Sequence, residues 1–348
     1  MIESKRLVYV DCIRGLCILL VIYHHFILMG MRGFNYQSSV EKFMYFFFLP
    51  LFFFISGFFA WKAKKMWNLK ETFLFIIKKI RSILIPTAVF FLVCMHFFCL
   101  NICDWLFVSF KSGYWFTWCL FQMFLCLSLF NFIVYFFKLE KFSSKCIFLL
   151  FFLAIIGNLA SRFFHESNPI VGLLSADLTL KYFVFFVFGI IVKCNLSRFE
   201  DYLSNRFINA FLLIIAFSPL CFKINSVMHI PVVFAQILCV FRIFSSKQNY
   251  FNGKNVPSNF LATCGKYSLS IYFLHYFLLF KIPQITLWLQ TFQTDYCFRG
   301  PSCVALLESL IIGFLSAFIA ICCIMIKKTI EVFPFVSELC FGPNPNKY

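Results

Sequence analysis

Residues 7–30 read LVYVDCIRGLCILLVIYHHFILMG, an apolar stretch that is interrupted by Asp11, Arg14, His24 and His25. About 20 mostly apolar residues in a helix are enough to cross a bilayer, so this stretch predicts a membrane helix. Its apolar residues do not alternate regularly with polar ones, which argues against a strand of a membrane barrel. The residues before it contain no small-residue cleavage site, and we expect the helix to be retained.

The composition of the whole chain resembles that of this first stretch. Of its 348 residues, 62% are hydrophobic and 13% are charged, against about 25% charged in a soluble domain. Ten apolar ranges are long enough to cross a membrane: 7–30, 41–61, 82–102, 115–137, 146–163, 179–195, 207–222, 228–244, 266–289 and 304–326. We therefore expect an all-α, polytopic transmembrane bundle of about ten helices, in which residues 1–348 form one integral-membrane domain.

The distribution of positive charge predicts the orientation of these helices. The chain has 31 Lys and Arg residues against 14 Asp and Glu. If the N-terminus is cytoplasmic, 23 of the 31 fall on the cytoplasmic side, as the positive-inside rule requires. An even number of helices then places both termini in the cytoplasm. A nucleic-acid-binding protein gathers its cations into one solvated patch, whereas here they lie in small clusters, so we expect no nucleic-acid partner.

Three polar residues of the first helix share one face. Arg14 and His25 are eleven positions apart, which leaves about 20° between them around the helix axis. Asp11 is an i, i+3 neighbour of Arg14 and is expected to pair with it, whereas His24 points about 100° away from His25. His25 lies roughly 16 Å further along the axis than Arg14, near the middle of the bilayer. Ionisable groups are costly there, so the stripe of Asp11, Arg14 and His25 indicates a functional site.

Five short motifs follow one another along the chain. They are DCIRGL (11–16) with ten residues between Arg14 and His25, FFFISGF (52–58), KKIR (78–81) followed by Ile85-Pro86, Trp115-Phe116 with Leu120-Phe121, and GKYSL (265–269) with Tyr272 and His275. Together they resemble the signature of the acyltransferase family 3 membrane proteins. In that family the third motif often has two arginines at i, i+3, and here Lys78 takes the place of the first.

The resemblance implies a multispanning O-acyltransferase of the inner (plasma) membrane that modifies glycans. The donor would be acetyl-CoA or another acyl-CoA, used as a substrate, with no permanently bound cofactor. The acceptor would be a hydroxyl of a cell-surface or lipid-linked sugar, and membrane lipids would surround the protein. The 17 cysteines show no CxxC pair and no metal-ligand spacing, so we expect no metal site.

Acyl transfer from a thioester to a hydroxyl requires a base. Imidazole is the usual general base near neutral pH, and His25 is our candidate, with Asp11 and His275 as further catalytic candidates. Ser268 and Tyr272 share one helix face with His275 and are expected to line the substrate site. Two alternatives stay open. In the first, Asp11 and Arg14 form an interfacial ion pair and His25 is a hydrogen-bonded packing residue. In the second, His275 only forms a hydrogen bond to a neighbouring helix.

The acyl donor requires cations, because coenzyme A is polyanionic and cytoplasmic. Arg14, Lys78 and Arg81 are placed at the cytoplasmic ends of the first and third predicted helices, and we assign them to its phosphates. Lys78 binds phosphate as a point charge and lacks the guanidinium fork of arginine. The alternative for Lys78 and Arg81 is ordinary anchoring of a helix by the positive-inside rule.

Two other classes of function fit parts of the sequence. A transporter or flippase for a lipid-linked sugar also has polar groups at mid-membrane, but the paired, Gly/Pro-broken half-helices of many transporters are not evident. A membrane interaction protein without chemistry leaves the polar stripe of the first helix unexplained.

Glu308 is expected at the membrane interface. Cys297 and Cys303 flank one predicted outer loop, where a disulfide is an open alternative.

Overall fold

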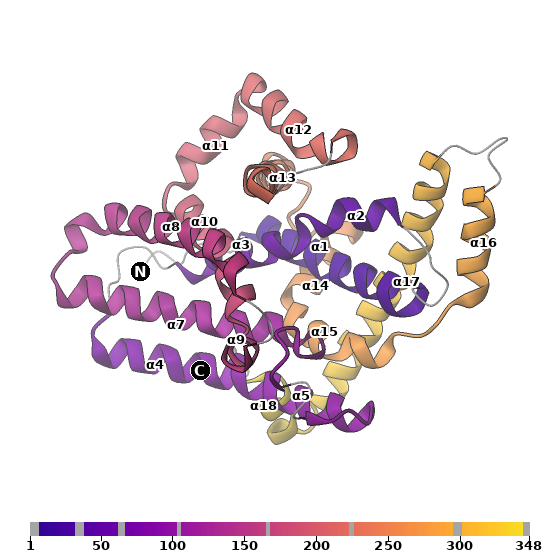
Figure 1. Ribbon diagram of the computed structural model, residues 1–348, viewed down its shortest axis with the longest axis horizontal. Coiled ribbons are helices and arrows are strands. Elements are labelled where there is room, and N and C mark those ends of the chain that lie inside the picture. Colours follow the sequence, from indigo (N-terminus) through magenta and orange to yellow (C-terminus); the bar gives the residue numbers. More distant parts are fainter. Residues whose placement is uncertain are drawn as a thin grey trace. The chain divides into compact units, whose positions relative to one another are not determined.

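A computed structural model describes residues 7–31, 38–61, 67–102, 106–164, 168–222, 226–294 and 301–343. The protein is 85% helical, with no strand among the described residues (Figure 1). By their contacts, the residues form two compact units, Met1–Phe52 with Ser197–Lys328 and Phe53–Leu196 with Thr329–Tyr348. The all-α expectation is confirmed, and a single membrane domain over the whole chain stays a prediction.

The first unit is organised around the N-terminal helix. Its elements are α1 (Val8–His25), a π-helical turn (Phe26–Met31), α2 (Ser39–Tyr45), the start of α3 (Phe48–Ala60), most of α11 (Leu196–Ser204), α12 (Arg206–Cys221), α13 (Ser226–Ser246), α14 (Val256–Lys266), α15 (Ser268–Leu274), a 3₁₀ turn (His275–Leu278), α16 (Pro283–Thr294) and most of α17 (Pro301–Ile330). α1 packs against α13, α14 and α15, and α12 packs along α13. The polar residues of the first helix therefore lie inside this unit.

The second unit is built around α7 and α10. Its elements are the rest of α3, α4 (Leu69–Lys79), a π-helical turn (Ile80–Leu84), α5 (Ile85–Phe97), 3₁₀ turns (Lys111–Gly113, Glu140–Phe142 and Ser161–Phe163), α7 (Trp115–Phe136), α8 (Ser143–Ala160), α9 (Pro169–Leu174), α10 (Ala176–Cys194) and α18 (Pro334–Phe341). α10 packs against α7 and α8, α4 against α7, and α18 against α5. Mostly apolar side chains fill these contacts.

Several helices have the length and composition of membrane spans. In the described parts of the chain there are seven: Val8–Met31, Ser39–Ala60, Leu69–Phe97, Trp115–Phe136, Glu140–Phe163, Met228–Ser246 and Cys303–Ile330. An eighth results if α11 and α12, which meet at an angle of 89°, form one broken span. The expectation of a polytopic bundle is confirmed, with fewer spans than the ten expected. The cytoplasmic placement of both termini stays a prediction.

Two of the ten expected spans differ from the helices of the structure. The range 179–195 forms α10, a helix of 19 residues that carries Asp177, Lys181 and Lys193 and is not among the seven spans. The range 266–289 is not one helix, because α15 gives way to a 3₁₀ turn and then to α16. This break shapes the candidate site described below.

The third expected span begins earlier than the sequence predicts. Asn68 and Glu71 form a capping box, each side chain bonding to the backbone N–H of the other, and this arrangement starts a helix. The helix then runs on through a π-helical turn into the expected range 82–102. Lys78 and Arg81 consequently lie within a helix and not in the connection that precedes it.

Two glycines bring α1 and α14 into close contact. A Cβ atom at Gly15 would lie 1.9 Å from the carbonyl oxygen of Leu261, and one at Gly265 would lie 2.0 Å from the carbonyl oxygen of Asp11. Such an approach requires residues without a side chain, as is frequent where membrane helices pack. Both glycines belong to the family-like motifs, so part of what those motifs encode is helix packing.

A second glycine pair has the same role between α3 and α10 in the other unit. A Cβ atom at Gly57 would lie 1.9 Å from the carbonyl oxygen of Phe186, and one at Gly189 would lie 2.0 Å from that of Phe54. The Ser56-Gly57 part of the FFFISGF motif is thus also a place where two backbones meet.

Lys111 is a buried cation in the connection before α7, outside the membrane spans. Its ammonium group donates hydrogen bonds to the carbonyl oxygens of Leu106 (2.7 Å) and Gly172 (2.8 Å). Burial lowers the pKa of Lys111 from 10.5 to about 8, although the carboxylate of Asp177 acts in the opposite direction. These carbonyl contacts tie the connection to α9.

The lowered pKa of Lys111 predicts a pH dependence of stability. Between about pH 8 and 10.5 the unfolded chain keeps a proton that the folded protein has lost, so the free energy of unfolding rises with pH in this interval. We expect the melting temperature of the detergent-solubilised protein to rise relative to that of Lys111→Met as the pH increases through it. Parallel profiles of the two proteins would contradict this assignment.

Candidate active site

The polar residues of the first helix lie on one continuous element. Asp11 is buried at 6% exposure in the first turn of α1. Arg14 is half-buried one turn further, and His25 is the last residue of α1, just before the π-helical turn. Interruptions of this kind in α-helices are frequent at functional sites. The pairing of Asp11 with Arg14 stays a prediction.

The structure brings His25 into contact with His275, which lies 250 residues further along the chain. Nδ1 of His25 and Nε2 of His275 are 3.1 Å apart, and the two ring centroids are 5.0 Å apart. The side chain of His275 is fully buried. Two of the three catalytic candidates of the sequence therefore form one hydrogen-bonded pair.

The break after α15 holds the His275 ring in place. Nδ1 of His275 is 2.8 Å from the carbonyl oxygen of Tyr272 and 3.2 Å from that of Ile271. Both carbonyls lie in the C-terminal half of α15, and that of Ile271 also accepts the backbone N–H of His275, so it serves the helix and the His275 ring together.

The hydrogen bonds determine which nitrogens carry protons. A carbonyl only accepts, so Nδ1 of His275 is protonated, and in the neutral ring Nε2 is left as an acceptor. His25 consequently donates from its own Nδ1, and its Nε2 is the acceptor nitrogen. The hydroxyl of Tyr276 is 2.9 Å from this Nε2 and donates to it. In this arrangement, the nitrogen ready to take up a proton is Nε2 of His25.

Tyr276 is a site residue that the sequence patterns did not single out. Its side chain is buried at 6% exposure, and its ring centroid is 4.1 Å from that of His275. His275 and Tyr276 are consecutive residues of the 3₁₀ turn His275–Leu278, and both side chains contact His25. Its place directly after the motif histidine was the only available signal.

Ser268 and Tyr272, which were expected to line the site, are both buried in α15. Tyr272 contributes its backbone carbonyl to His275, and its ring centroid is 6.1 Å from that of His275. The hydroxyl of Ser268 has no hydrogen-bond partner among the described residues. Buried hydroxyls usually have a partner, and an unsatisfied one agrees with a position on a ligand site.

Lys78 and Arg81 belong to the second unit, on the long helix Leu69–Phe97. Lys78 is in the last turn of α4 and Arg81 is in the π-helical turn that follows, and both side chains are exposed. Exposed cations three positions apart suit a polyanionic ligand. That they act on one donor molecule together with Arg14 of the first unit stays a prediction.

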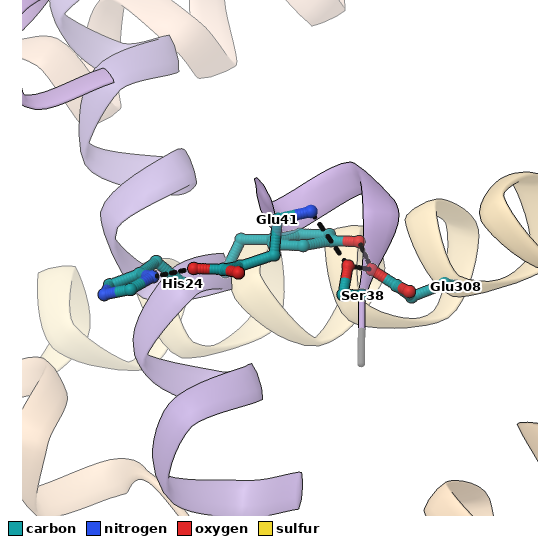
Figure 2. A network of polar contacts seen from close by, with 5 residues as sticks. His24, Ser38, Glu41 and Glu308 are labelled. Atoms are coloured by element: carbon teal, nitrogen blue, oxygen red, sulfur yellow. Dashed lines mark hydrogen bonds and ion pairs between the residues drawn. The ribbon is translucent and has the colours of Figure 1, made fainter. Parts of the chain in front are cut away.

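A second polar network lies beside the first, around the start of α2 (Figure 2). His24 Nδ1 and Glu41 Oε1 are 2.7 Å apart. Ser38 Oγ accepts the backbone N–H of Glu41 (2.8 Å) and donates to Glu308 (2.5 Å), which also accepts a hydrogen bond from the hydroxyl of Tyr23. Glu308 is only 1% exposed, because its partners hold it inside the protein, and its expected depth at the membrane interface stays a prediction.

The partners of this network could be read from the sequence only in part. Ser38 and Glu41 have the S-x-x-E spacing of a helix N-terminus, which indicates the start of α2 but not its neighbours. No group of three or more His, Cys, Asp or Glu side chains in the described ranges is placed to hold a metal ion. Cys297 lies outside the described residues, so a pairing with Cys303 stays open.

Comparison with known proteins places the chain in a family. The model of acyltransferase family 3, described as an acyltransferase domain, matches residues 7–327. No curated protein and no solved structure matches the chain. The matched range covers nearly the whole sequence, including the histidine pair and most of the apolar helices. This multi-pass protein therefore belongs to acyltransferase family 3 and is a membrane acyltransferase.

Proposed function

We propose that the protein is an O-acetyltransferase of the inner membrane, which moves an acetyl group from cytoplasmic acetyl-CoA to a hydroxyl of a cell-surface or lipid-linked glycan. The observation that carries this proposal is the acceptor nitrogen of His25. Its Nδ1 is engaged by His275 and its Nε2 receives a hydroxyl, that of Tyr276. This nitrogen has one lone pair, so the acceptor hydroxyl would take the place of the Tyr276 hydroxyl there, and Nε2 would then act as its general base.

The reaction follows from this geometry. As the acceptor oxygen attacks the thioester carbonyl, its proton passes to His25 Nε2. The new C–O bond forms, the C–S bond breaks, and the sulfur of coenzyme A leaves with the electron pair and takes up a proton. The positive charge that arises on His25 is stabilised through its Nδ1–H bond to His275, whose own ring faces two carbonyl dipoles.

The donor phosphates are assigned to Arg14, Lys78 and Arg81. Cations that form charge-assisted hydrogen bonds to phosphate oxygens are the usual means of holding such a ligand. Asp11, buried three positions before Arg14, would orient the guanidinium. Ser268 and Tyr272, beside His275, would contact the transferred acyl group or the acceptor.

The test is transfer of label from acetyl-CoA. Membranes that contain the protein are supplied with labelled acetyl-CoA and with lipid-linked and free glycans, and the label is followed into base-labile glycan esters. Incorporation that depends on the protein supports the proposal. Movement of a lipid-linked sugar across the membrane without gain of an ester would favour a transporter instead and would overturn it.

Arg14→Ala is expected to weaken the binding of coenzyme A by about 10- to 100-fold, because it removes a charge-assisted hydrogen bond worth about 1.5–3 kcal/mol. Titration of the purified protein with coenzyme A measures the effect. Arg198→Ala is the matched control, since Arg198 is an exposed arginine on α11. Equal affinities of the native protein and Arg14→Ala would reject the assignment of Arg14 to the donor.

A further inference from the structure

His24 and His25 are neighbours in sequence but have different surroundings. Their ring centroids are 5.2 Å apart. His24 is paired with a carboxylate, that of Glu41, whereas the partners of His25 are the neutral side chains of His275 and Tyr276. Two imidazoles whose environments differ in this way are suited to opposite proton-transfer roles.

The position of Glu41 is fixed by a chain of hydrogen bonds. Its backbone N–H bonds to Ser38 Oγ, which in turn donates to the buried carboxylate of Glu308 (Figure 2). Tyr23, from α1 itself, donates to the same carboxylate. The start of α2 is thereby tied to α17, and Glu41 is held opposite His24. The network orders a carboxylate next to an imidazole, which is the arrangement that positions a catalytic histidine.

The His24 ring is also fixed by its neighbours, and one of its nitrogens is left for a ligand. Its centroid is 5.3 Å from that of Tyr45 and 5.4 Å from that of Phe48. With 16% of the His24 side chain and 19% of that of Glu41 exposed, the pair is accessible. In the part of the chain that the structure describes, Nε2 of His24 has no hydrogen-bond partner, in contrast to both ring nitrogens of His25.

Charge decides which of the two rings carries the extra proton. An imidazolium is stabilised by a carboxylate within hydrogen-bonding distance, and two imidazolium rings about 5 Å apart would repel each other. A proton added to His24 would face the carboxylate of Glu41, whereas the partners of His25 are His275 and Tyr276. A protonated His24 has its Nε2–H available for donation, since Nδ1–H faces Glu41.

We propose that His24 is a second catalytic residue, the general acid of the transfer, and that Glu41 is its positioning residue. As the C–S bond of the thioester breaks, Nε2 of His24 gives its proton to the sulfur of coenzyme A, and the free thiol leaves. His25 takes the proton of the attacking hydroxyl, so one proton enters the pair of rings and one leaves it. Return of the proton from His25 to His24 restores the starting state. The assignment rests on the proposed acetyl transfer.

Rates in mixtures of H₂O and D₂O distinguish an acid from a structural ion pair. If two protons move in the transition state, a plot of the transfer rate of the native protein against the fraction of D₂O is curved. His24→Asn is expected to lower the rate by about 10²-fold and to make this dependence linear, because only the proton taken by His25 remains. Glu41→Gln, which removes the charge but keeps an oxygen acceptor, is expected to lower the rate by about tenfold.

His96→Asn is the matched control, since His96 is an exposed histidine on α5 outside the network, and its rate should equal that of the native protein. A linear dependence in the native protein, a rate of His24→Asn within about twofold of native, or a slower variant with an unchanged curve would overturn the acid role. If His25→Ala still transfers acetyl groups, the proposed function itself fails. If only His25→Ala is inactive and His24→Asn is not, the general base stands and the acid does not.

Discussion

Replacement of His25 by alanine is expected to lower the rate of acetyl transfer by about 10³-fold, within the range that general bases contribute. Without the imidazole, nothing at this point of α1 accepts the proton of the attacking hydroxyl, and the hydrogen bonds to His275 and Tyr276 are lost with it. Binding of coenzyme A should remain, since the phosphates are assigned to Arg14, Lys78 and Arg81. Labelled transfer and a separate coenzyme A titration measure the two quantities.

A variant of His275, the partner of His25, should lose less transfer activity than His25→Ala. His275→Gln removes the ring that receives the Nδ1–H bond, but it leaves His25 itself, so the expected loss is smaller, about tenfold. Native elution of each variant in size-exclusion chromatography excludes misfolding as the cause. Normal transfer by folded His25→Ala would eliminate His25 as the base, and equal losses for both variants would point to disruption of the pair as a whole.

Gly265→Val is expected to prevent accumulation of folded protein, the second large effect. Already the Cβ atom would lie 2.0 Å from the carbonyl oxygen of Asp11, far inside van der Waals contact. The obstacle is backbone and not a flexible side chain, so α1 and α14 would have to separate. Overpacking of this kind usually lowers stability by about 1–3 kcal/mol, and for a contact this short we expect a loss at or above about 3 kcal/mol. Yield and melting temperature in detergent measure the effect.

The chain offers a matched control in the same unit. Gly313 lies in α17, and a Cβ atom there would have no heavy atom within 4 Å. Gly313→Val should therefore fold, apart from the small cost of a β-branched residue in a helix. Gly15→Ala should behave like the Gly265 variant, because its Cβ would lie 1.9 Å from the carbonyl of Leu261. A stable Gly265→Val protein would show that the two helices do not pack at this distance.

Much of the fold could be predicted from the sequence because membrane helices are encoded locally. A run of about 20 apolar residues forms a helix in lipid whatever its neighbours are, since its backbone must bond to itself. The first helix, its polar stripe and the multi-pass architecture follow from this rule. The rule fails for 266–289, where apolar composition predicts one span and the structure has α15, a 3₁₀ turn and α16.

The site could be predicted only one residue at a time. The pattern indicated His25 and His275 because ionisable groups inside apolar stretches are rare. It did not indicate Tyr276, whose hydroxyl is unremarkable in an aromatic-rich chain, or the pairing of His24 with Glu41. It also gave no sign that Glu308 is buried with Tyr23 and Ser38 as its partners.

The sequence by itself determined that this protein is a polytopic, all-α membrane protein with family 3 motifs and that its first helix carries a polar stripe. Only the tertiary structure decided the chemistry around that stripe: the contact of His25 with His275, the donation from Tyr276, and the second dyad of His24 and Glu41. The physical reason is range. Helix formation depends on neighbours within one turn, whereas hydrogen bonds form only within about 3 Å. Helix packing alone brings side chains that are 250 residues apart to that distance.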